Sequence, residues 1–297
     1  MVRNLNGVSG VVRRRAERLE ANPSNLIRVM PAEGAEMRLP KPTPFTSDLP
    51  DAAADILARL RARGPRVHCI TNAVAQNFTA NVLLAAGAVP SMTISPLEIA
   101  EFVARADALL INLGTLDRGR RESVEAAIEE VTDERRPWVL DPVFVDRSQA
   151  RNAFAKALVG KKPWVVRLNG AEFSALADAA PMDDALRSYA LHQLGVLALT
   201  GATDIVTDGS RIVRIKNGDP LMSQVTAMGC AGAAVVAACL AVEGDPWVAS
   251  AAALLLFAIA GECAAARARG PGSFAIEFID ALHGLDRETL RARAKVD

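Results

Sequence analysis

The chain has 297 residues with 34 basic and 34 acidic side chains, so its formal net charge is zero, and aromatic residues make up only 4%. A balanced charge and few aromatic rings provide neither the basic surface nor the stacking platforms of nucleic-acid-binding proteins, which argues against nucleic acid as a partner. Hydrophobic residues at 51% and charged residues at 23% describe a globular chain and exclude disorder as its main state.

The first 48 residues differ from the rest of the chain. Three consecutive arginines at 13–15 are followed by prolines at 23, 31, 40, 42 and 44, and apolar periodicity is weak. We therefore expect residues 1–48 to be a loosely ordered extension. No linker-like stretch interrupts the remainder, so we expect one domain over residues 49–297.

Short apolar runs of strand length then alternate with amphipathic helical stretches. Strands are expected at residues 66–70, 108–113, 138–140, 164–167, 196–200 and 212–215. Helices are expected at residues 51–63, 75–86, 96–104, 120–131, 183–194, 228–242, 246–267 and 275–285. Repeated strand-helix-strand units predict an α/β fold whose mainly parallel sheet is covered by helices on both faces.

The most apolar run covers residues 246–260. It is shorter than the ~18 apolar residues that span a bilayer, so it predicts a buried helix and no membrane association. The four cysteines are Cys69, Cys230, Cys239 and Cys263. They form no Cys-x-x-Cys pair and have no histidine at metal-ligand spacing, which predicts free thiols and a cytoplasmic protein.

The common phosphate-binding signatures are missing from this sequence, because it has no G-x-x-x-x-G-K-[ST] loop and no G-x-G-x-x-G run after a strand. The remaining candidate is segment 224–232, which leads into the apolar helix expected at 228–242. The first N–H groups of a helix lack intrahelical partners and lie at its positive end, so they bind anions. Small residues such as Gly229 would let a phosphoryl group approach, or they simply permit close helix packing.

Cys230 lies at this expected helix start. The positive end of a helix can lower the pKa of a cysteine below its usual ~8.5, so Cys230 could accept a proton from a substrate hydroxyl. A free cysteine is also a common core residue, which is the role expected for Cys239 and Cys263.

Two acids follow expected strands at the carboxyl edge of the sheet, where α/β proteins bind ligands. Asp141 ends one strand, and Glu172 follows the next, with Arg167 and Asn169 beside it. The group would suit a magnesium-nucleotide site, because magnesium is usually held by one or two carboxylates plus phosphates. Taken singly, Asp141 can also be a cap or turn aspartate, and Glu172 a first-turn helix acid.

Polar side chains also follow the strand expected at 66–70, beginning with Thr71 and Asn72. Polar groups this close to a core strand need partners, which a ligand or a neighbouring chain would supply. Asn72 can alternatively cap the next helix. We interpret His68, inside the strand, as a structural histidine whose hydrogen bonds are satisfied.

Taken together, these segments resemble the hydroxyethylthiazole kinase family, from about residue 49 to residue 285. The matching motifs are residues 67–72, 76–81, 87–92, 111–116, 140–143, 206–209, 218–222, 229–230 and 270–274. The resemblance implies a ribokinase-like fold and transfer of the ATP γ-phosphoryl group to the primary alcohol of 4-methyl-5-(2-hydroxyethyl)thiazole in thiamine salvage. It further implies magnesium and a homotrimer whose thiazole pockets lie between subunits.

The resemblance also implies residue roles. Met92 matches the methionine that contacts the thiazole, and Asn72 lies in the substrate-side motif. Arg167 and Thr200 match ATP-contacting positions, with Asn169 in the same motif as Arg167. Asp141 and Glu172 match the acids near magnesium. Cys230, preceded by Gly229, matches the cysteine that stands where other ribokinase-like enzymes carry a catalytic aspartate.

Departures from the family pattern concentrate in the phosphate site. The family usually reads G-T-G-C where this chain has residues 227–230, so its substrate-contacting glycine has become Ala227. Alanine still serves there while its φ stays negative, although the neighbouring Met228 narrows the approach. Phe144 stands in a loop that usually contains glycine, and Leu168 replaces the glycine between Arg167 and Asn169.

Our working hypothesis is that Cys230 orients or deprotonates the alcohol while the amides of residues 228–230 hold the moving phosphoryl group. Two alternatives remain. A same-fold dehydratase of hydrated nicotinamide nucleotides would want an aspartate at the position of Cys230. A non-catalytic nucleotide- or thiazole-binding protein would be explained by Ala227, Met228 and Phe144 blocking the site.

Overall fold

The structure is a computed structural model that describes residues 48–297 apart from 135 and 194, so residues 1–47 of the expected extension lie outside it. Its strands are β1 (Arg66–Ile70), β2 (Val89–Ser91), β3 (Ala108–Asn112), β4 (Trp138–Asp141), β5 (Val165–Asn169), β6 (Val196–Thr200), β7 (Asp204–Thr207) and β8 (Ile212–Ile215). They form one sheet in the order β2-β1-β3-β4-β5-β6-β7-β8. All neighbours from β2 to β6 are parallel, whereas β7 pairs antiparallel with β6 and β8.

Both faces of the sheet are buried. In β4, Val139 belongs to the core on one face, while Trp138 and Leu140 belong to the core on the other. Successive side chains of a strand point to opposite faces, so a strand covered on both sides must be apolar throughout. This confirms the α/β fold class expected from the sequence.

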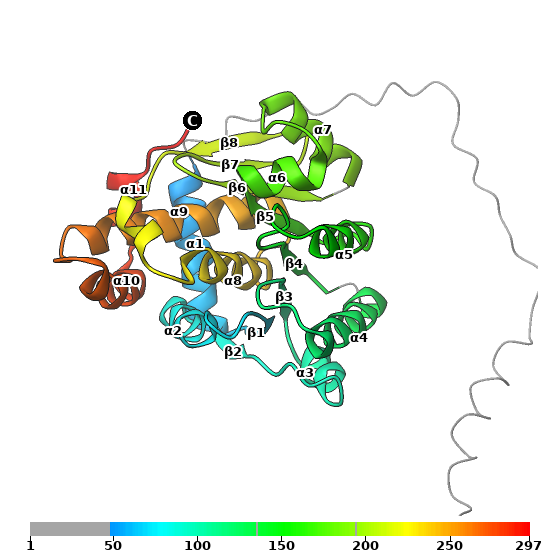
Figure 1. The fold of residues 1–297 in the computed structure, drawn as a ribbon. Coiled ribbons are helices and arrows are strands. Elements are labelled where there is room, and N and C mark those ends of the chain that lie inside the picture. The colour runs from blue at the N-terminus through cyan, green and yellow to red at the C-terminus, as the bar shows by residue number, and fades with distance from the viewer. Residues whose placement is uncertain (1–47, 135, 194) are drawn as a thin grey trace, which may run out of the picture. The chain divides into compact units, whose positions relative to one another are not determined.

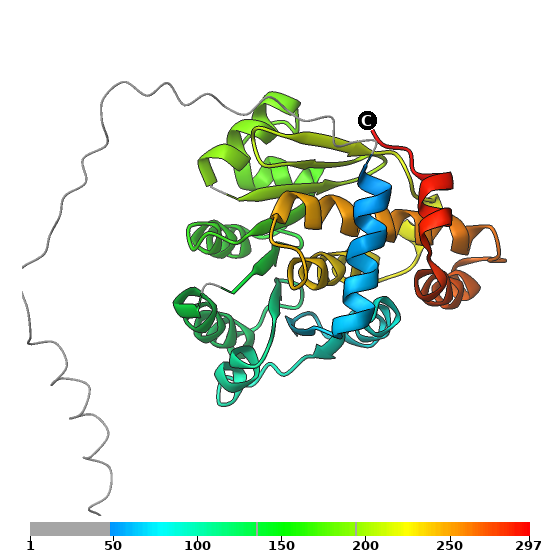
Figure 2. The same cartoon turned by 180° about the vertical axis from the view of Figure 1, so that it is seen from behind.

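One face is covered by an inner and an outer layer of helices. They are α1 (Leu49–Arg63), α2 (Gln76–Ala86), α8 (Met228–Leu240), α9 (Pro246–Ala265), α10 (Pro271–Gly284) and α11 (Arg287–Arg293). Of these, α8 lies against β1, β3 and β4, α9 lies against β6 to β8, and α1 packs on the outer side of α9. Figure 1 shows α8, α2 and α10 on this side of the sheet, and Figure 2 shows α1 from behind.

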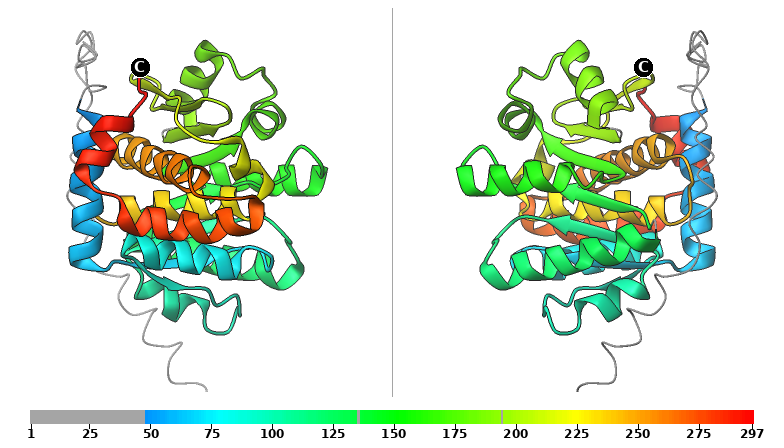
Figure 3. Two further views of the ribbon diagram at one scale, coloured as in Figure 1. Left: turned by 90° about the vertical axis from the view of Figure 1, so that its left-hand side faces the viewer. Right: turned by 90° about the vertical axis from the view of Figure 1, so that its right-hand side faces the viewer.

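The opposite face is covered by a single layer of helices. They are α3 (Ile99–Ala104), α4 (Arg118–Glu134), α5 (Gln149–Val159), α6 (Gly170–Ala177) and α7 (Asp183–Gln193). The two views of Figure 3 place α10 and α2 foremost from one side and α4 and α5 foremost from the other. The sheet therefore lies between two layers of helices on one face and a single layer on the other.

The expected strands and helices all occur, with ends displaced by a few residues, but several elements were not predicted. These are β2, β7, α5, α6, α11 and the 3-10 helix η1 (Pro220–Gln224). The two strands are three and four residues long, which is too short for apolar periodicity to stand out. Their register on β1 and β6 comes from the neighbouring strands and not from a local pattern.

Helix α9 is 20 residues long and apolar enough to pass a membrane-span criterion by length and composition, so the expectation that this run is too short to span was wrong. The helix nevertheless belongs to the core, because 78% of its most apolar stretch is buried inside the protein. It lies between the sheet and α1. The expected role as a core helix is confirmed.

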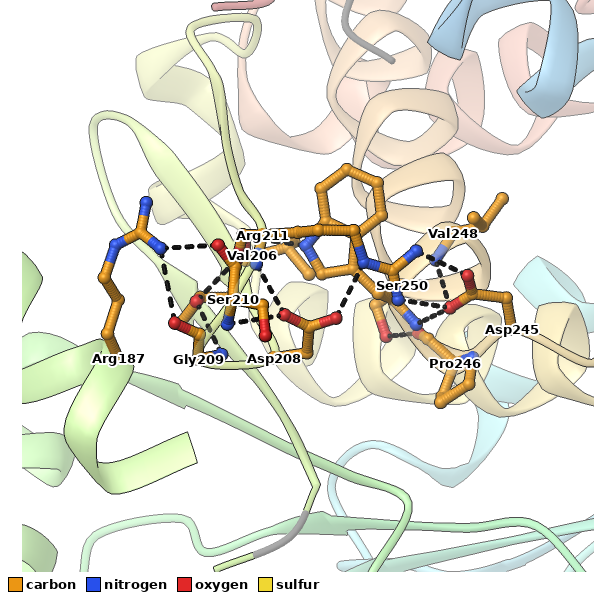
Figure 4. Close-up of polar contacts among 12 residues, drawn as sticks. Arg187, Val206, Asp208, Gly209, Ser210, Arg211, Asp245, Pro246, Val248 and Ser250 are labelled. Carbon is orange, nitrogen blue, oxygen red and sulfur yellow. Dashed lines mark hydrogen bonds and ion pairs between the residues drawn. The ribbon is translucent and has the colours of Figure 1, made fainter. Parts of the chain in front are cut away.

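The turn between β7 and β8 is bonded to the start of α9 (Figure 4). Arg211 donates to both carboxylate oxygens of Asp245, at 2.5 and 3.0 Å, and its guanidinium lies 4.6 Å from the centroid of the Trp247 ring. Asp245 in turn caps α9 by accepting from the backbone N–H groups of Trp247 and Val248. These contacts hold the turn of the antiparallel part of the sheet on the start of α9.

Candidate active site

Polar side chains gather where the parallel strands end. Asn112 ends β3, Asp141 ends β4, Arg167 lies near the end of β5, and Thr200 ends β6. The residue two positions before each belongs to the core beneath α8 and α9, so strand alternation places all four on that face. The expectation that the strands carrying Asp141 and Arg167 end side by side at one edge of the sheet is confirmed, because β4 and β5 pair in parallel.

The first turn of α8 lies at this same edge, and Gly229 within it is in close contact with Arg167. A Cβ atom added to Gly229 would lie 2.9 Å from Nη1 of Arg167. Any side chain at position 229 would therefore displace the guanidinium. The glycine lets a fixed positive charge lie directly over the positive end of the helix, an arrangement suited to an anion.

Ala227, the residue before α8, adopts a left-handed conformation with φ of 73°. The condition of a negative φ, under which alanine was expected to serve at this position, is therefore not met. A glycine would adopt this conformation without the steric cost that a Cβ brings. The alanine thus carries local backbone strain at the entrance to the helix.

Two buried asparagines connect Cys230 with Asp141. The side-chain amide of Asn72 donates to Cys230 Sγ at 3.1 Å and to Asn112 Oδ1 at 3.2 Å. The amide of Asn112 donates to Asp141 Oδ2 at 2.6 Å. Asn72 does not cap α2 but accepts from the backbone of Ala75 within its own turn. We call Cys230, Asn72, Asn112 and Asp141 the amide chain.

Asp141 is fully buried, yet only one of its carboxylate oxygens is hydrogen-bonded. Oδ1 has no hydrogen-bond partner and lies 3.8 Å from Nη1 of Arg167. Burial raises the pKa of Asp141 to about 7, against the opposing effect of Arg167. A buried carboxylate oxygen without a hydrogen bond is a costly feature that a cation or a donor from a ligand would relieve.

Cys230 was expected to have a lowered pKa, and the structure contradicts this. Burial, reinforced by the nearby charge of Asp141, raises the pKa of its thiol to about 11. The effect of desolvation therefore outweighs the hydrogen bond from Asn72 and the nearby positive charge of Arg167. The thiol is protonated at neutral pH.

Glu172 and Asn169 form a capping box at the start of α6. Asn169 Oδ1 accepts from the backbone of Glu172, and Glu172 Oε2 accepts from the backbone of Asn169. The second oxygen of Glu172 accepts from the backbone of Phe144 at 2.9 Å. Both carboxylate oxygens therefore hold backbone N–H groups, as in the first-turn alternative weighed from the sequence.

A cavity of about 500 Å³ lies beside the start of α8. Its wall includes Arg167, Thr200, Met228 and Gly229, together with the loop from Lys216 to Pro220. A volume of this size suits a drug-sized or nucleotide-sized ligand. Met92 and Asn72 do not line it: Asn72 lies in the amide chain, and Met92 packs against the core on the α8 face.

Asp204 also lines this cavity and was not predicted as a site residue from the sequence. Gly201 N donates to Asp204 Oδ1 at 2.9 Å, and burial raises the pKa of Asp204 to about 6. Asn112, at the centre of the amide chain, was missed as a site residue as well. It stands at a strand end just as Asp141 does, which is the signal that would have found it.

Met228 and Phe144, the two bulky departures, do not plug the site. Met228 is 6% exposed and belongs to the core beneath α8, with part of its surface at the cavity wall. Phe144 is 58% exposed and is not part of that wall. Neither side chain fills the cavity. A filled cavity would have favoured the non-catalytic alternative.

A preformed cluster of metal ligands is absent from the described part of the chain, where no group of three His, Cys, Asp or Glu side chains could hold a metal ion. A magnesium ion bound with a nucleotide needs fewer protein ligands, because phosphate oxygens and water complete its shell. The free Oδ1 of Asp141 fits that requirement. Glu172 adds negative charge nearby, although its oxygens are already hydrogen-bonded.

A cavity between the carboxyl edge of a mainly parallel sheet and a helix N-terminus, with an arginine in its wall that lies 3.8 Å from a buried carboxylate, defines a ribokinase-like phosphotransferase. The fold agrees: a ribokinase-like superfamily protein from Enterococcus faecalis V583 superposes with a TM-score of 0.62 over 78% of this chain and 93% of that chain, at 13% identity.

The family is established by sequence. The family model described as "Hydroxyethylthiazole kinase family" matches residues 57–288. A hydroxyethylthiazole kinase from Rhizobium etli is 45% identical over 255 residues, covering 81% of this chain and 99% of its own length. The structure of the hydroxyethylthiazole kinase protein from Pyrococcus horikoshii OT3 superposes with a TM-score of 0.79 at 36% identity, covering 83% and 98% of the two chains. The chain belongs to the hydroxyethylthiazole kinase family.

Replacing Ala227 with glycine should relieve the strain before α8. We expect Ala227→Gly to raise the free energy of unfolding by roughly 0.5–1 kcal/mol, because the left-handed conformation is costly for alanine. Chemical denaturation measures this. The matched control is Ala231→Gly inside the same helix, which should lower stability by about 1 kcal/mol or more. A destabilised Ala227→Gly would contradict the assigned strain.

The raised pKa of Cys230 predicts slow alkylation. Only the thiolate reacts, so the rate of Cys230 modification by iodoacetamide should rise about tenfold per pH unit from pH 7 to pH 10. Mass spectrometry of the peptide that contains Cys230 follows the reaction, with Cys230→Ser identifying its signal. A rate that levels off below pH 9 would show that the positive end of α8 lowers the pKa of Cys230 in spite of its burial.

Proposed function

We propose that ATP binds in the 500 Å³ cavity with its γ-phosphoryl group at the start of α8, and that the acceptor alcohol lies beside Cys230. The activity is that of a hydroxyethylthiazole kinase in thiamine salvage. The primary alcohol of 4-methyl-5-(2-hydroxyethyl)thiazole attacks the γ-phosphorus of ATP. A bond forms between the alcohol oxygen and the γ-phosphorus while the bond from that phosphorus to the β-phosphate oxygen breaks. ADP leaves, and the proton of the alcohol passes to an oxygen of the transferred phosphoryl group or to water.

The observation that supports this arrangement is the junction of Arg167, Gly229 and Asp141. Arg167 lies over Gly229 and 3.8 Å from Asp141, so positive and negative groups meet where the phosphates would end. Phosphoryl transfer depends mainly on positioning and on stabilisation of the charge on the transferred group. Arg167 and the first N–H groups of α8 supply that stabilisation, and Thr200 lines the cavity where the nucleotide extends.

We assign Asp141 as the residue that would hold magnesium, through its free Oδ1. When bound, magnesium would neutralise charge on the phosphate oxygens. Asn112 fixes Oδ2 of the same carboxylate and leaves Oδ1 directed away from that bond. Glu172 supports the site from α6 by holding the loop at Phe144 in place.

Cys230 is proposed to orient the alcohol and not to act as a strong base. Its thiol has a pKa of about 11 and therefore keeps its proton at neutral pH. A transition state with little bond formation requires only a weak base, so an orienting contact is sufficient. The dehydratase alternative is disfavoured by the thiol at this position, and the non-catalytic alternative by the open cavity.

The test is ATP consumption by the purified protein with and without the thiazole alcohol. Consumption should depend on the alcohol, Cys230→Ser should lower kcat at least about tenfold with the KM for ATP nearly unchanged, and Arg167→Ala should raise the KM for ATP. Consumption only with a hydrated nicotinamide nucleotide would identify a dehydratase. Binding of ATP or alcohol without turnover would identify a binding protein.

We also propose a homotrimer formed through the edge of the sheet at β2. Apolar side chains are exposed on and around this edge strand: Val74, Leu84, Val89, Leu97 and Phe102. Exposed apolar groups together with an unpaired strand edge are typical of a surface that another subunit covers. Because all four thiols are free, we also propose a cytoplasmic location.

Analytical ultracentrifugation measures the assembly. The wild type should sediment as a trimer, and Leu97→Asp, at a side chain that is 95% exposed, should shift it towards the monomer. Met182→Asp, at a similarly exposed residue before α7, is the matched control and should leave the trimer intact. A wild-type monomer, or equal effects of both variants, would refute the proposed surface.

A further inference from the structure

His68 is a buried polar residue that the proposed mechanism does not use. It lies inside β1, is fully buried, and faces the side of the sheet that α3 covers, where its ring lies 5.9 Å from that of Phe102. Core strands seldom carry a histidine without a specific set of partners. Both of its ring nitrogens make such contacts.

The two partners of His68 lie on either side of a single residue in the sequence. Nδ1 of His68 lies 2.7 Å from the hydroxyl of Ser91, and Nε2 lies 3.1 Å from the carbonyl oxygen of Thr93. Ser91 ends β2 directly opposite His68 in the sheet, whereas Thr93 lies beyond the strand. The residue between the two contacts is Met92.

The two hydrogen bonds have defined directions. A carbonyl oxygen only accepts, so Nε2 must carry the proton and donate to Thr93. Nδ1 then accepts from the hydroxyl of Ser91. Burial lowers the pKa of the His68 ring, which keeps it neutral and preserves these roles.

The contacts determine where Met92 points. Ser91 and Thr93 are held towards His68, so the side chain between them is directed to the other face, where Met92 packs against the core that includes α2 and α8. Other side-chain bonds hold this stretch as well, since Ser123 donates to the carbonyl of Ile94 at 2.8 Å and Thr93 donates to Glu98. Met92 itself is only partly buried and can contact a ligand.

We infer that His68 is a positioning residue for Met92: by bonding to the residues on both sides, it fixes the methionine on the alcohol-binding side of the site. The inference rests on the proposed function and on the contact with the thiazole that the family resemblance implies for Met92. His68 does not touch substrate in this arrangement. It sets specificity through the backbone of residues 91–93.

The test compares His68→Leu, which loses both bonds, with His68→Gln, whose amide can still donate to Thr93. We expect His68→Leu to raise the KM for the thiazole alcohol about tenfold while the KM for ATP changes less than about twofold. His68→Gln should restore most of the affinity. Ser91→Ala, which removes only the Nδ1 partner, should give an intermediate effect and keeps the test available if His68→Leu does not fold.

Two controls separate positioning from general destabilisation. Thr207→Val removes a buried hydroxyl that bonds to Arg211 O in the distant β7–β8 turn, and it should lower the melting temperature without changing the KM for the alcohol. In a double-mutant cycle, His68→Leu should add little to the KM of Met92→Ala, because its effect acts through Met92.

The outcomes distinguish this inference from the proposed function. If the wild type does not phosphorylate the thiazole alcohol, the proposed function fails and direct calorimetric binding of the alcohol decides the inference. If the wild type is active but His68→Leu leaves the KM for the alcohol unchanged, or if the two substitutions are additive, the inference is overturned and the proposed function stands.

Discussion

The site depends on one electrostatic constraint: Asp141 is buried beside Arg167 at the point where α8 begins. Neither group would be stable there alone, since an isolated buried charge is strongly disfavoured. Arg167 lies 3.8 Å from the carboxylate, and Asn112 bonds to its other oxygen, yet Oδ1 has no hydrogen bond and the pKa of Asp141 is raised to about 7. The protein thus keeps a buried carboxylate oxygen that no hydrogen bond stabilises.

The rest of the fold keeps these groups together. Parallel strands bring Asn112, Asp141 and Thr200 to one edge, and the apolar length of α8 and α9 fills the space beneath them. A glycine at 229 allows α8 to approach Arg167, and a strained alanine at 227 turns the chain into the helix. The same packing that partly buries Cys230 also keeps its thiol protonated.

Several parts of the site could be predicted and others could not. The strand-end positions of Asp141 and Arg167 follow from apolar runs that stop at polar residues, and these positions were correct. The expectation of a lowered pKa for Cys230 was wrong, because it considered the helix end alone and sequence does not show how deeply a side chain is buried. A first-turn helix acid was one of two interpretations of Glu172, and only the structure shows that its two oxygens accept from the backbone of Asn169 and Phe144.

By itself, the sequence determined the layered α/β fold, the family and the approximate edge where the chemistry lies, because these depend on periodicity and on ordered motifs along the chain. Only the tertiary structure decided which polar atoms meet. The amide chain joins Asn72, Asn112 and Cys230, which are up to 158 positions apart in the sequence. Asp204 lines the cavity from β7, a strand too short to be predicted from its apolar pattern. Hydrogen bonds and desolvation act over a few ångströms in space, so the spacing of residues along the chain does not reveal them.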